Sequence, residues 1–159
     1  MVLNKKTGYE FIIYLNKCDL DEVDTSNYPE LKRRLTKIFK GIKKNGLINP
    51  GFYEVEAYIN KDYGVILEVK REYEDYLELL KGDIDLRVLV NYNQIFLYKT
   101  NDAQIINRDK TNVYYYDEGV YLELMNNLTR KEWGILLENS IIIYGDVTND
   151  IKQYGKLII

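Results

Sequence analysis

The sequence predicts an α/β fold of the α+β type, in which two small, largely antiparallel sheets each carry one or two packed helices. Apolar and polar residues alternate in several short runs, which is the period of half-buried strands. Two other stretches repeat apolar residues at three- and four-residue steps and begin with helix-capping residues. Short turn sequences join neighbouring strand candidates, and short connections favour antiparallel pairs.

The chain has 159 residues, with 22 basic and 25 acidic side chains and a net charge of −3. This length suits one medium domain or two small ones, and the near balance of charge indicates neither nucleic acid nor a strongly basic partner. The single cysteine, Cys18, excludes a disulfide within the chain. No apolar run approaches the roughly 20 residues that span a bilayer, and the start lacks the apolar block of a signal peptide. We therefore expect a cytoplasmic protein with no membrane partner.

Residues 1–71 are predicted to form a first domain, with one helix over one face of a three-stranded sheet. The stretch 8–15 is apolar on nearly both faces, so we expect an inner strand there. Two alternating runs, 53–59 and 65–69, are joined by the turn sequence 60–64 and predict a hairpin. The order of elements in this domain is therefore β-α-β-β.

The helix of the first domain has recognisable ends. Ser26 or Asn27, just ahead of Pro29, supplies the capping residue and the start. Gly46 supplies the left-handed stop after the last turn. Because the apolar residues between these ends recur at three- and four-residue steps, one face of the helix is expected to be buried.

The same helix is strongly basic. Seven cations fall within a stretch of 13 residues that contains no acid: Lys32, Arg33, Arg34, Lys37, Lys40, Lys43 and Lys44. We expect Lys32, Arg33, Lys37 and Lys40 to form a basic strip that faces solvent, because these positions lie away from the apolar face. Two interpretations stay open. The strip is either a solvated face balanced by the acidic loop before the helix, or a surface that attracts an acidic partner or a phosphate backbone.

A second domain is predicted over residues 85–159, after a short linker or helical segment at 72–84. Residues 85–91 alternate as a strand would. The stretch 94–100 is a further strand candidate, whereas residues 95–106 also suit a helix. The sequence leaves this choice open.

Residues 111–124 predict a tyrosine-rich hairpin. Apolar and aromatic residues alternate on both sides of the turn Asp117-Glu118-Gly119. Tyrosine offers a large amphipathic contact area at low cost in conformational entropy. We therefore expect Tyr114, Tyr116 and Tyr121 to contribute to protein binding.

A helix is predicted to begin after Thr129. This residue stands three positions before Glu132, which is the spacing of a capping box. Trp133 and the leucines that follow it share one face of the helix. The isoleucine-rich run 141–144 then predicts a buried strand on which the helix lies.

No constellation of catalytic or metal-binding residues stands out in the sequence. The chain contains no histidine, which is the commonest general base and the commonest zinc ligand. Neither of the common glycine-rich phosphate-binding patterns occurs. The acidic run from Asp19 to Asp24 lacks the glycine and the glutamate of a calcium loop, and Glu54 and Glu56 are interpreted as outward-facing charges. We expect a protein that is not an enzyme and that uses no metal or cofactor.

The second half of the chain resembles the carboxyl-terminal domain of the MecA family of adaptor proteins. The resemblance lies in the tyrosine-rich hairpin, in Leu128-Thr129 ahead of a helix, in the isoleucine-rich strand and in the closing run 154–159. The first half is similar to the amino-terminal domain of that family in the order of its elements and in an Asp-Leu pair, Asp19-Leu20, ahead of the helix.

Members of the MecA family deliver substrates to the Clp chaperone-protease of Gram-positive bacteria. The resemblance implies that the first domain takes a client or regulatory protein, through the region of Asp19 to Lys44, and that the second docks a Clp ATPase. The alternative is a nucleic-acid-binding or nucleic-acid-mimicking accessory protein, which would use the basic helix or the acidic, tyrosine-rich sheet.

Overall fold

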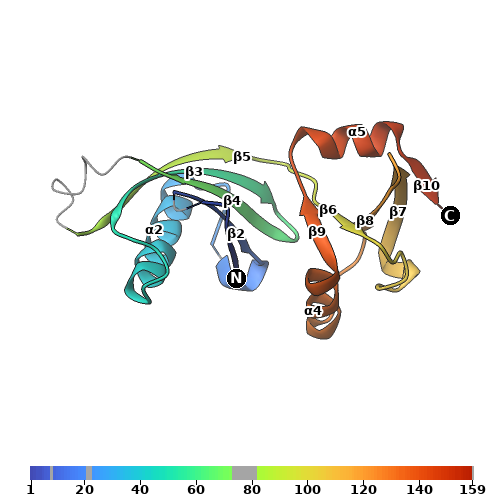
Figure 1. The fold of residues 1–159 in the computed structure, drawn as a ribbon, viewed down its shortest axis with the longest axis horizontal. Coiled ribbons are helices and arrows are strands. Elements are labelled where there is room, and N and C mark those ends of the chain that lie inside the picture. The colour runs from blue at the N-terminus through green and yellow to red at the C-terminus, as the bar shows by residue number, and fades with distance from the viewer. Residues whose placement is uncertain (8, 21–22, 73–81, 159) are drawn as a thin grey trace. The chain divides into compact units, whose positions relative to one another are not determined.

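The computed structural model describes residues 1–7, 9–20, 23–72 and 82–158. The chain divides into two compact units, Met1–Asn93 and Gln94–Ile159, each of which is described here by itself (Figure 1).

The first unit is built on a five-stranded sheet, counted over its described residues, in the order β1-β2-β4-β3-β5. The strands are β1 (Val2–Lys5), β2 (Glu10–Leu15), β3 (Gly51–Asn60), β4 (Gly64–Arg71) and β5 (Ile84–Asn91). Neighbours pair antiparallel, except that β5 runs parallel to β3. The predicted inner strand is confirmed over Glu10–Leu15, because β2 lies between β1 and β4, and residue 8 lies outside the described residues. The predicted hairpin is confirmed by the pairing of β3 with β4.

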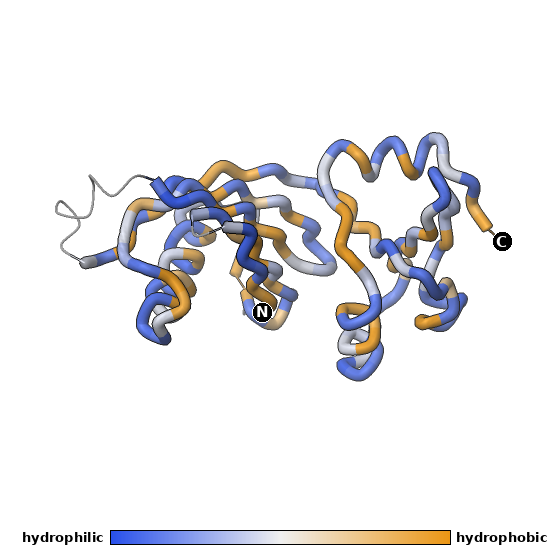
Figure 2. The backbone as a smooth tube through the Cα atoms, in the orientation of Figure 1, coloured by the Kyte–Doolittle hydropathy of each residue, from blue (hydrophilic) through white to orange (hydrophobic). Residues whose placement is uncertain are grey.

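Helix α2 (Tyr28–Lys44) covers one face of this sheet, and the short helix α1 (Lys17–Leu20) precedes it (Figure 1). Leu31, Leu35 and Phe39 of α2 are fully buried against apolar side chains of the strands. Apolar and polar stretches alternate along the backbone of this unit (Figure 2). The core is therefore the layer between α2 and the sheet.

A glycine closes the hairpin between β3 and β4. Gly64 has a φ of +133°, and a Cβ atom at this position would lie 2.2 Å from the backbone oxygen of Leu15. Any side chain would push the hairpin away from β2, so Gly64 is required by both backbone conformation and space.

The predicted domain boundary is wrong. Residues 85–91 were expected in the second domain, but they belong to β5 at the edge of the first sheet, and the first unit extends to Asn93. Alternation identifies a strand without identifying its partner, and a parallel partner is separated from it by a long crossover connection. Of the predicted linker 72–84, residues 73–81 lie outside the described part of the chain.

The second unit also contains a five-stranded sheet over its described residues, entirely antiparallel, in the order β10-β7-β8-β6-β9. Its elements are β6 (Leu97–Thr100), η2 (Arg108–Lys110), β7 (Thr111–Tyr116), β8 (Gly119–Leu124), α4 (Arg130–Asn139), β9 (Ser140–Ile143), α5 (Asp146–Tyr154) and β10 (Lys156–Ile158). Together the two units confirm the predicted α+β class with largely antiparallel sheets.

The hairpin of β7 and β8 is confirmed, with Asp117 and Glu118 at φ values of 45° and 63° in its tight turn. The sequence left residues 95–106 open between a strand and a helix. The structure has the strand β6 there, which pairs with both β8 and β9. The strand predicted at 141–144 exists as β9, but the prediction that it is buried is wrong. It lies at the sheet edge, and the side chain of Ile141 is 68% exposed.

Helix α4 begins with the predicted capping box. Thr129 Oγ1 accepts a hydrogen bond from the backbone N–H of Glu132 at 3.2 Å, and Glu132 Oε1 accepts one from the backbone N–H of Thr129 at 3.2 Å. Leu136 is fully buried, and the ring of Trp133 meets that of Tyr98 edge to face at 6.3 Å. Within the described residues, no helix is both long and apolar enough to cross a bilayer.

Candidate protein-binding surfaces

The start of α2 sets the direction in which its cations point. The Asn27 side chain accepts from the backbone N–H of Glu30 at 3.2 Å, and Pro29 occupies the first turn. With the apolar residues of α2 buried, three members of the basic strip, Arg33, Lys37 and Lys40, are exposed, and Lys32 is half-buried. The prediction that the strip faces solvent is therefore supported by the placement of its four residues.

The basic strip borders a hollow of about 620 Å³. Tyr28, Pro29 and Thr36 line the hollow together with the four cations. We call this surface the α2 hollow. Its lining combines positive charge with apolar groups, which include the Tyr28 ring, the Pro29 ring and the aliphatic stems of the lysines.

Three cations of α2 have partners among the described residues of the unit. Arg34 donates to the backbone carbonyl of Asp19 at 3.2 Å, and Lys43 donates to that of Gly82 at 3.1 Å. Lys40 forms an ion pair with Asp83 at 3.7 Å, in which both side chains are about half exposed to solvent.

The pKa of Asp83 is held below its ordinary value. The main cause is the backbone N–H of Ile84, which donates to the carboxylate, and Lys40 and Lys43 add a smaller electrostatic contribution. The Asp83 carboxylate therefore stays charged near neutral pH and competes with any other anion for Lys40.

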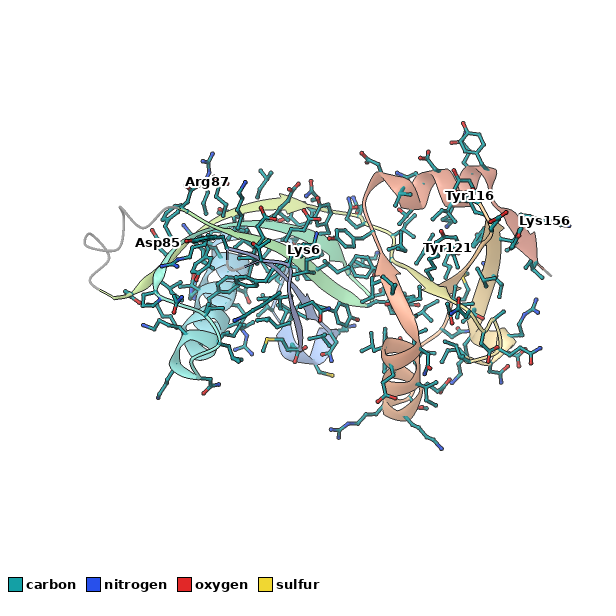
Figure 3. The ribbon with its side chains drawn as sticks, viewed as in Figure 1. Lys6, Asp85, Arg87, Tyr116, Tyr121 and Lys156 are labelled. Carbon is teal, nitrogen blue, oxygen red and sulfur yellow. The ribbon has the colours of Figure 1, made fainter. Side chains whose placement is uncertain are left out.

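Two of the three predicted binding tyrosines belong to the core. Tyr114 and Tyr121 are each 8% exposed and pack with Leu97 and Ile151, while Tyr116 is half-buried beside them. The prediction of a tyrosine contact surface is therefore wrong for Tyr114 and Tyr121. The physical reason is α5, which the sequence pattern did not indicate and which covers the face of β7 and β8 that carries them (Figure 3).

A polar network ties α5 to that face. Glu123 Oε2 accepts from Lys152 Nζ at 2.5 Å, while the Tyr114 hydroxyl and the Asn112 amide donate to Glu123 Oε1 at 3.4 Å. The hydrogen bond to Glu123 raises the pKa of Lys152. Burial, followed by the Glu123 charge, raises the pKa of Tyr114. Both groups stay protonated at neutral pH, so Lys152 and Tyr114 keep their contacts with Glu123. We infer that this network holds α5 on the sheet.

The opposite face of the second sheet presents exposed side chains at its β10 edge. Lys156 stands opposite Tyr115, and Ile158 stands opposite Val113, so Tyr115, Lys156 and Ile158 share one face. All three are exposed, Tyr115 to 45% and Ile158 to 37%. We call this surface the β10 patch; Figure 3 labels Lys156 on it. Strand alternation could have suggested it, because Tyr115 has the opposite phase to Tyr114 and Tyr116.

The uncovered face of the first sheet carries rows of charge. One row, read across four strands, alternates in sign through Glu10, Lys70, Glu54 and Arg87. Arg87, which Figure 3 labels, forms an exposed ion pair with Glu54 at 3.6 Å. A hollow of about 430 Å³ lies over this face. Glu54 and Glu56 face outward as predicted, and Glu56 accepts from the Asn91 amide at 3.0 Å. Among the described residues, no acidic or cysteine cluster suits a metal ion.

The fold and these surfaces define a class: an α+β protein of two compact units, each with its own core and its own exposed surface. Comparison of the chain with protein-family models, with curated proteins and with solved structures gives no match.

Proposed function

We propose that the chain is a non-enzymatic cytoplasmic adaptor, similar to MecA, which links client or regulatory proteins to a Clp chaperone-protease. The observation that carries the proposal is the presence of two separately cored units, each with an exposed surface that mixes charge and apolar contact area. An adaptor needs two such surfaces because it holds two partners at once.

In this proposal each surface has one partner. The first unit takes the client at the α2 hollow, where four cations and apolar groups are available together. The second unit docks the Clp ATPase at the β10 patch, where Tyr115 and Ile158 offer aromatic and aliphatic contact area beside the charge of Lys156.

The test is capture from a Gram-positive lysate on the immobilised chain, with and without ATP. We expect recovery of a Clp ATPase, identified by mass spectrometry, and its loss with the pair Tyr115→Ser and Ile158→Ser. The matched control is Val147→Ser, because Val147 is also 45% exposed and lies on α5, outside the patch. Capture that does not include a Clp ATPase, or that is unaffected by the paired substitution, contradicts this assignment.

The alternative is nucleic-acid binding, which the row of cations on α2 favours. Two observations weigh against it: the cations lie on one helix, and Asp83 stands beside Lys40 and would repel phosphate. A mobility assay near 0.1 M salt with mixed-sequence single strand and duplex distinguishes the two. We expect no submicromolar binding, and such binding would favour the alternative.

A further inference from the structure

Two rows of side chains, each with a four-residue repeat, border the α2 hollow. They are Tyr28, Lys32, Thr36 and Lys40 in one row and Pro29, Arg33 and Lys37 in the other. At 1.5 Å per residue, the longer row extends about 18 Å along the helix axis. An extended chain rises about 3.3 Å per residue, so five or six residues would span the hollow.

The chemistry of the hollow changes along its length. At the amino-terminal end, the Tyr28 hydroxyl donates to the backbone carbonyl of Val88 at 2.9 Å, which holds the ring in place. Pro29 lies beside it, so this end is apolar and already ordered. The cations Lys32, Arg33 and Lys37 follow toward the other end. A ligand that fits both parts has an apolar residue near one end and negative charges after it.

The spacing of the cations selects a pattern of negative charge. Arg33 and Lys37 are one helical turn apart, which is about 6 Å along the axis. Alternate residues of an extended chain, whose side chains point to the same face, are also about 6.6 Å apart. Carboxylates at every second position would therefore meet successive cations, whereas adjacent carboxylates would point to opposite faces.

The far end of the hollow already holds one such contact. Asp83 pairs with Lys40 at 3.7 Å while both side chains are about half exposed, and exposed pairs of this kind are weak. A carboxylate of a partner would compete with Asp83 for Lys40. This contact shows that Lys40 can pair with a carboxylate. Removing the charge of Asp83 therefore tests the site without altering any cation of the strip.

We infer that the α2 hollow binds an extended acidic segment of a partner protein, with carboxylates at alternate positions and an apolar residue at the Tyr28 end. The inference rests on the proposed function, since it names the class of client segment that the first unit takes.

The experiment measures the fluorescence anisotropy of labelled peptides on the full chain. The probe is Phe-Ser-Glu-Ser-Glu-Ser-Phe, which places its aromatic and acidic side chains on one face of an extended chain and offers an apolar end in either chain direction. The composition-matched control is Phe-Ser-Ser-Glu-Glu-Ser-Phe. We expect the alternating probe to bind at least fivefold more tightly than the block peptide, and its binding to weaken as salt rises. Equal affinities would overturn the alternating pattern.

Charge reversal locates the site. The pair Arg33→Glu and Lys37→Glu should weaken probe binding at least tenfold. The control pair, Lys17→Glu and Lys61→Glu, makes the same change in net charge at exposed positions outside the hollow and should change binding less than threefold. Asp83→Asn removes the competing charge, keeps an oxygen that can accept from Ile84, and should tighten binding about two- to fivefold. Equal effects of both reversed pairs would overturn the site.

The same samples separate this inference from the proposed function. Capture of a Clp ATPase by the Arg33→Glu, Lys37→Glu chain reports on the second unit alone. If the ATPase is captured and the unsubstituted chain does not bind the probe, the inference is wrong and the adaptor proposal stands. If the probe binds as expected and no Clp ATPase is captured, the hollow is an acidic-segment site and the Clp assignment is wrong. Tighter binding of a labelled oligothymidylate than of the probe would overturn the choice of a protein segment.

Discussion

At Thr129, one hydroxyl group determines how α4 begins. Its Oγ1 accepts from the N–H of Glu132 at 3.2 Å and satisfies a backbone donor that the helix itself leaves unpaired. We expect Thr129→Ala to lower the free energy of unfolding of the second unit by about 1 kcal/mol. Urea titration followed by the fluorescence of the single tryptophan, Trp133, measures this. Thr129→Ser keeps the hydroxyl and should cost much less; equal losses in the two variants would contradict the capping role.

The partner in that box, Glu132, makes the stability of the second unit depend on pH. Its pKa is lowered, first because Lys110 Nζ donates to the carboxylate at 2.8 Å and then because the Thr129 N–H donates to it. The unfolded chain therefore takes up this proton at a higher pH than the folded chain does. The stabilisation is present above the ordinary pKa of 4.5 and is lost as pH falls through the lowered value.

We accordingly expect the urea midpoint of the Trp133 transition to fall as pH drops below about 4.5, and to fall less steeply in Glu132→Gln. Glu138→Gln is the matched control, because Glu138 is an exposed carboxyl on the same helix. A wild-type slope in the Glu132 variant would show that other carboxyls carry the acid sensitivity.

At the scale of the element, α2 separates a face that stabilises the fold from a face that is free to bind. Leu35 is fully buried, whereas Arg33 and Lys37 are exposed. We expect Leu35→Ala to cost about 2–5 kcal/mol because it leaves a cavity in the core. The pair Arg33→Glu and Lys37→Glu should leave the thermal midpoint nearly unchanged. Calorimetry on the two variants measures both effects, and a collapse of folding in the charge-reversed pair would make the strip structural.

For the whole molecule, the presence of two cores predicts that a substitution in one core destabilises only the unit that contains it. Leu35 lies in the core of the first unit, and Leu136 is buried in the second. We expect Leu136→Ala to lower the urea midpoint of the Trp133 transition, because Trp133 is on the same helix. Leu35→Ala should instead speed amide hydrogen exchange in β3 and β4 and leave the Trp133 transition in place. If both substitutions shift both probes equally, the chain unfolds as one cooperative block.

Prediction from sequence succeeded where the information is local. Thr129 caps its helix as expected, and the first helix is capped by Asn27, one of the two residues expected there, because capping depends on residues three positions apart. The turn at Asp117 and Glu118 formed as expected, because a tight turn links strands that are adjacent in the sequence. The basic strip was also predictable, because helical periodicity alone determines which side chains lie opposite the buried face.

The sequence by itself therefore determined the α+β class, the capped helices, the hairpins and the basic strip. Only the tertiary structure decided that β5 joins the first sheet, that β9 lies at an edge, and that α5 covers Tyr114 and Tyr121. Strand alternation defines two faces and says nothing about which face a distant element will cover, or which strand will pair alongside. Those outcomes depend on contacts between residues far apart in the chain, and such contacts leave no periodic pattern in the sequence.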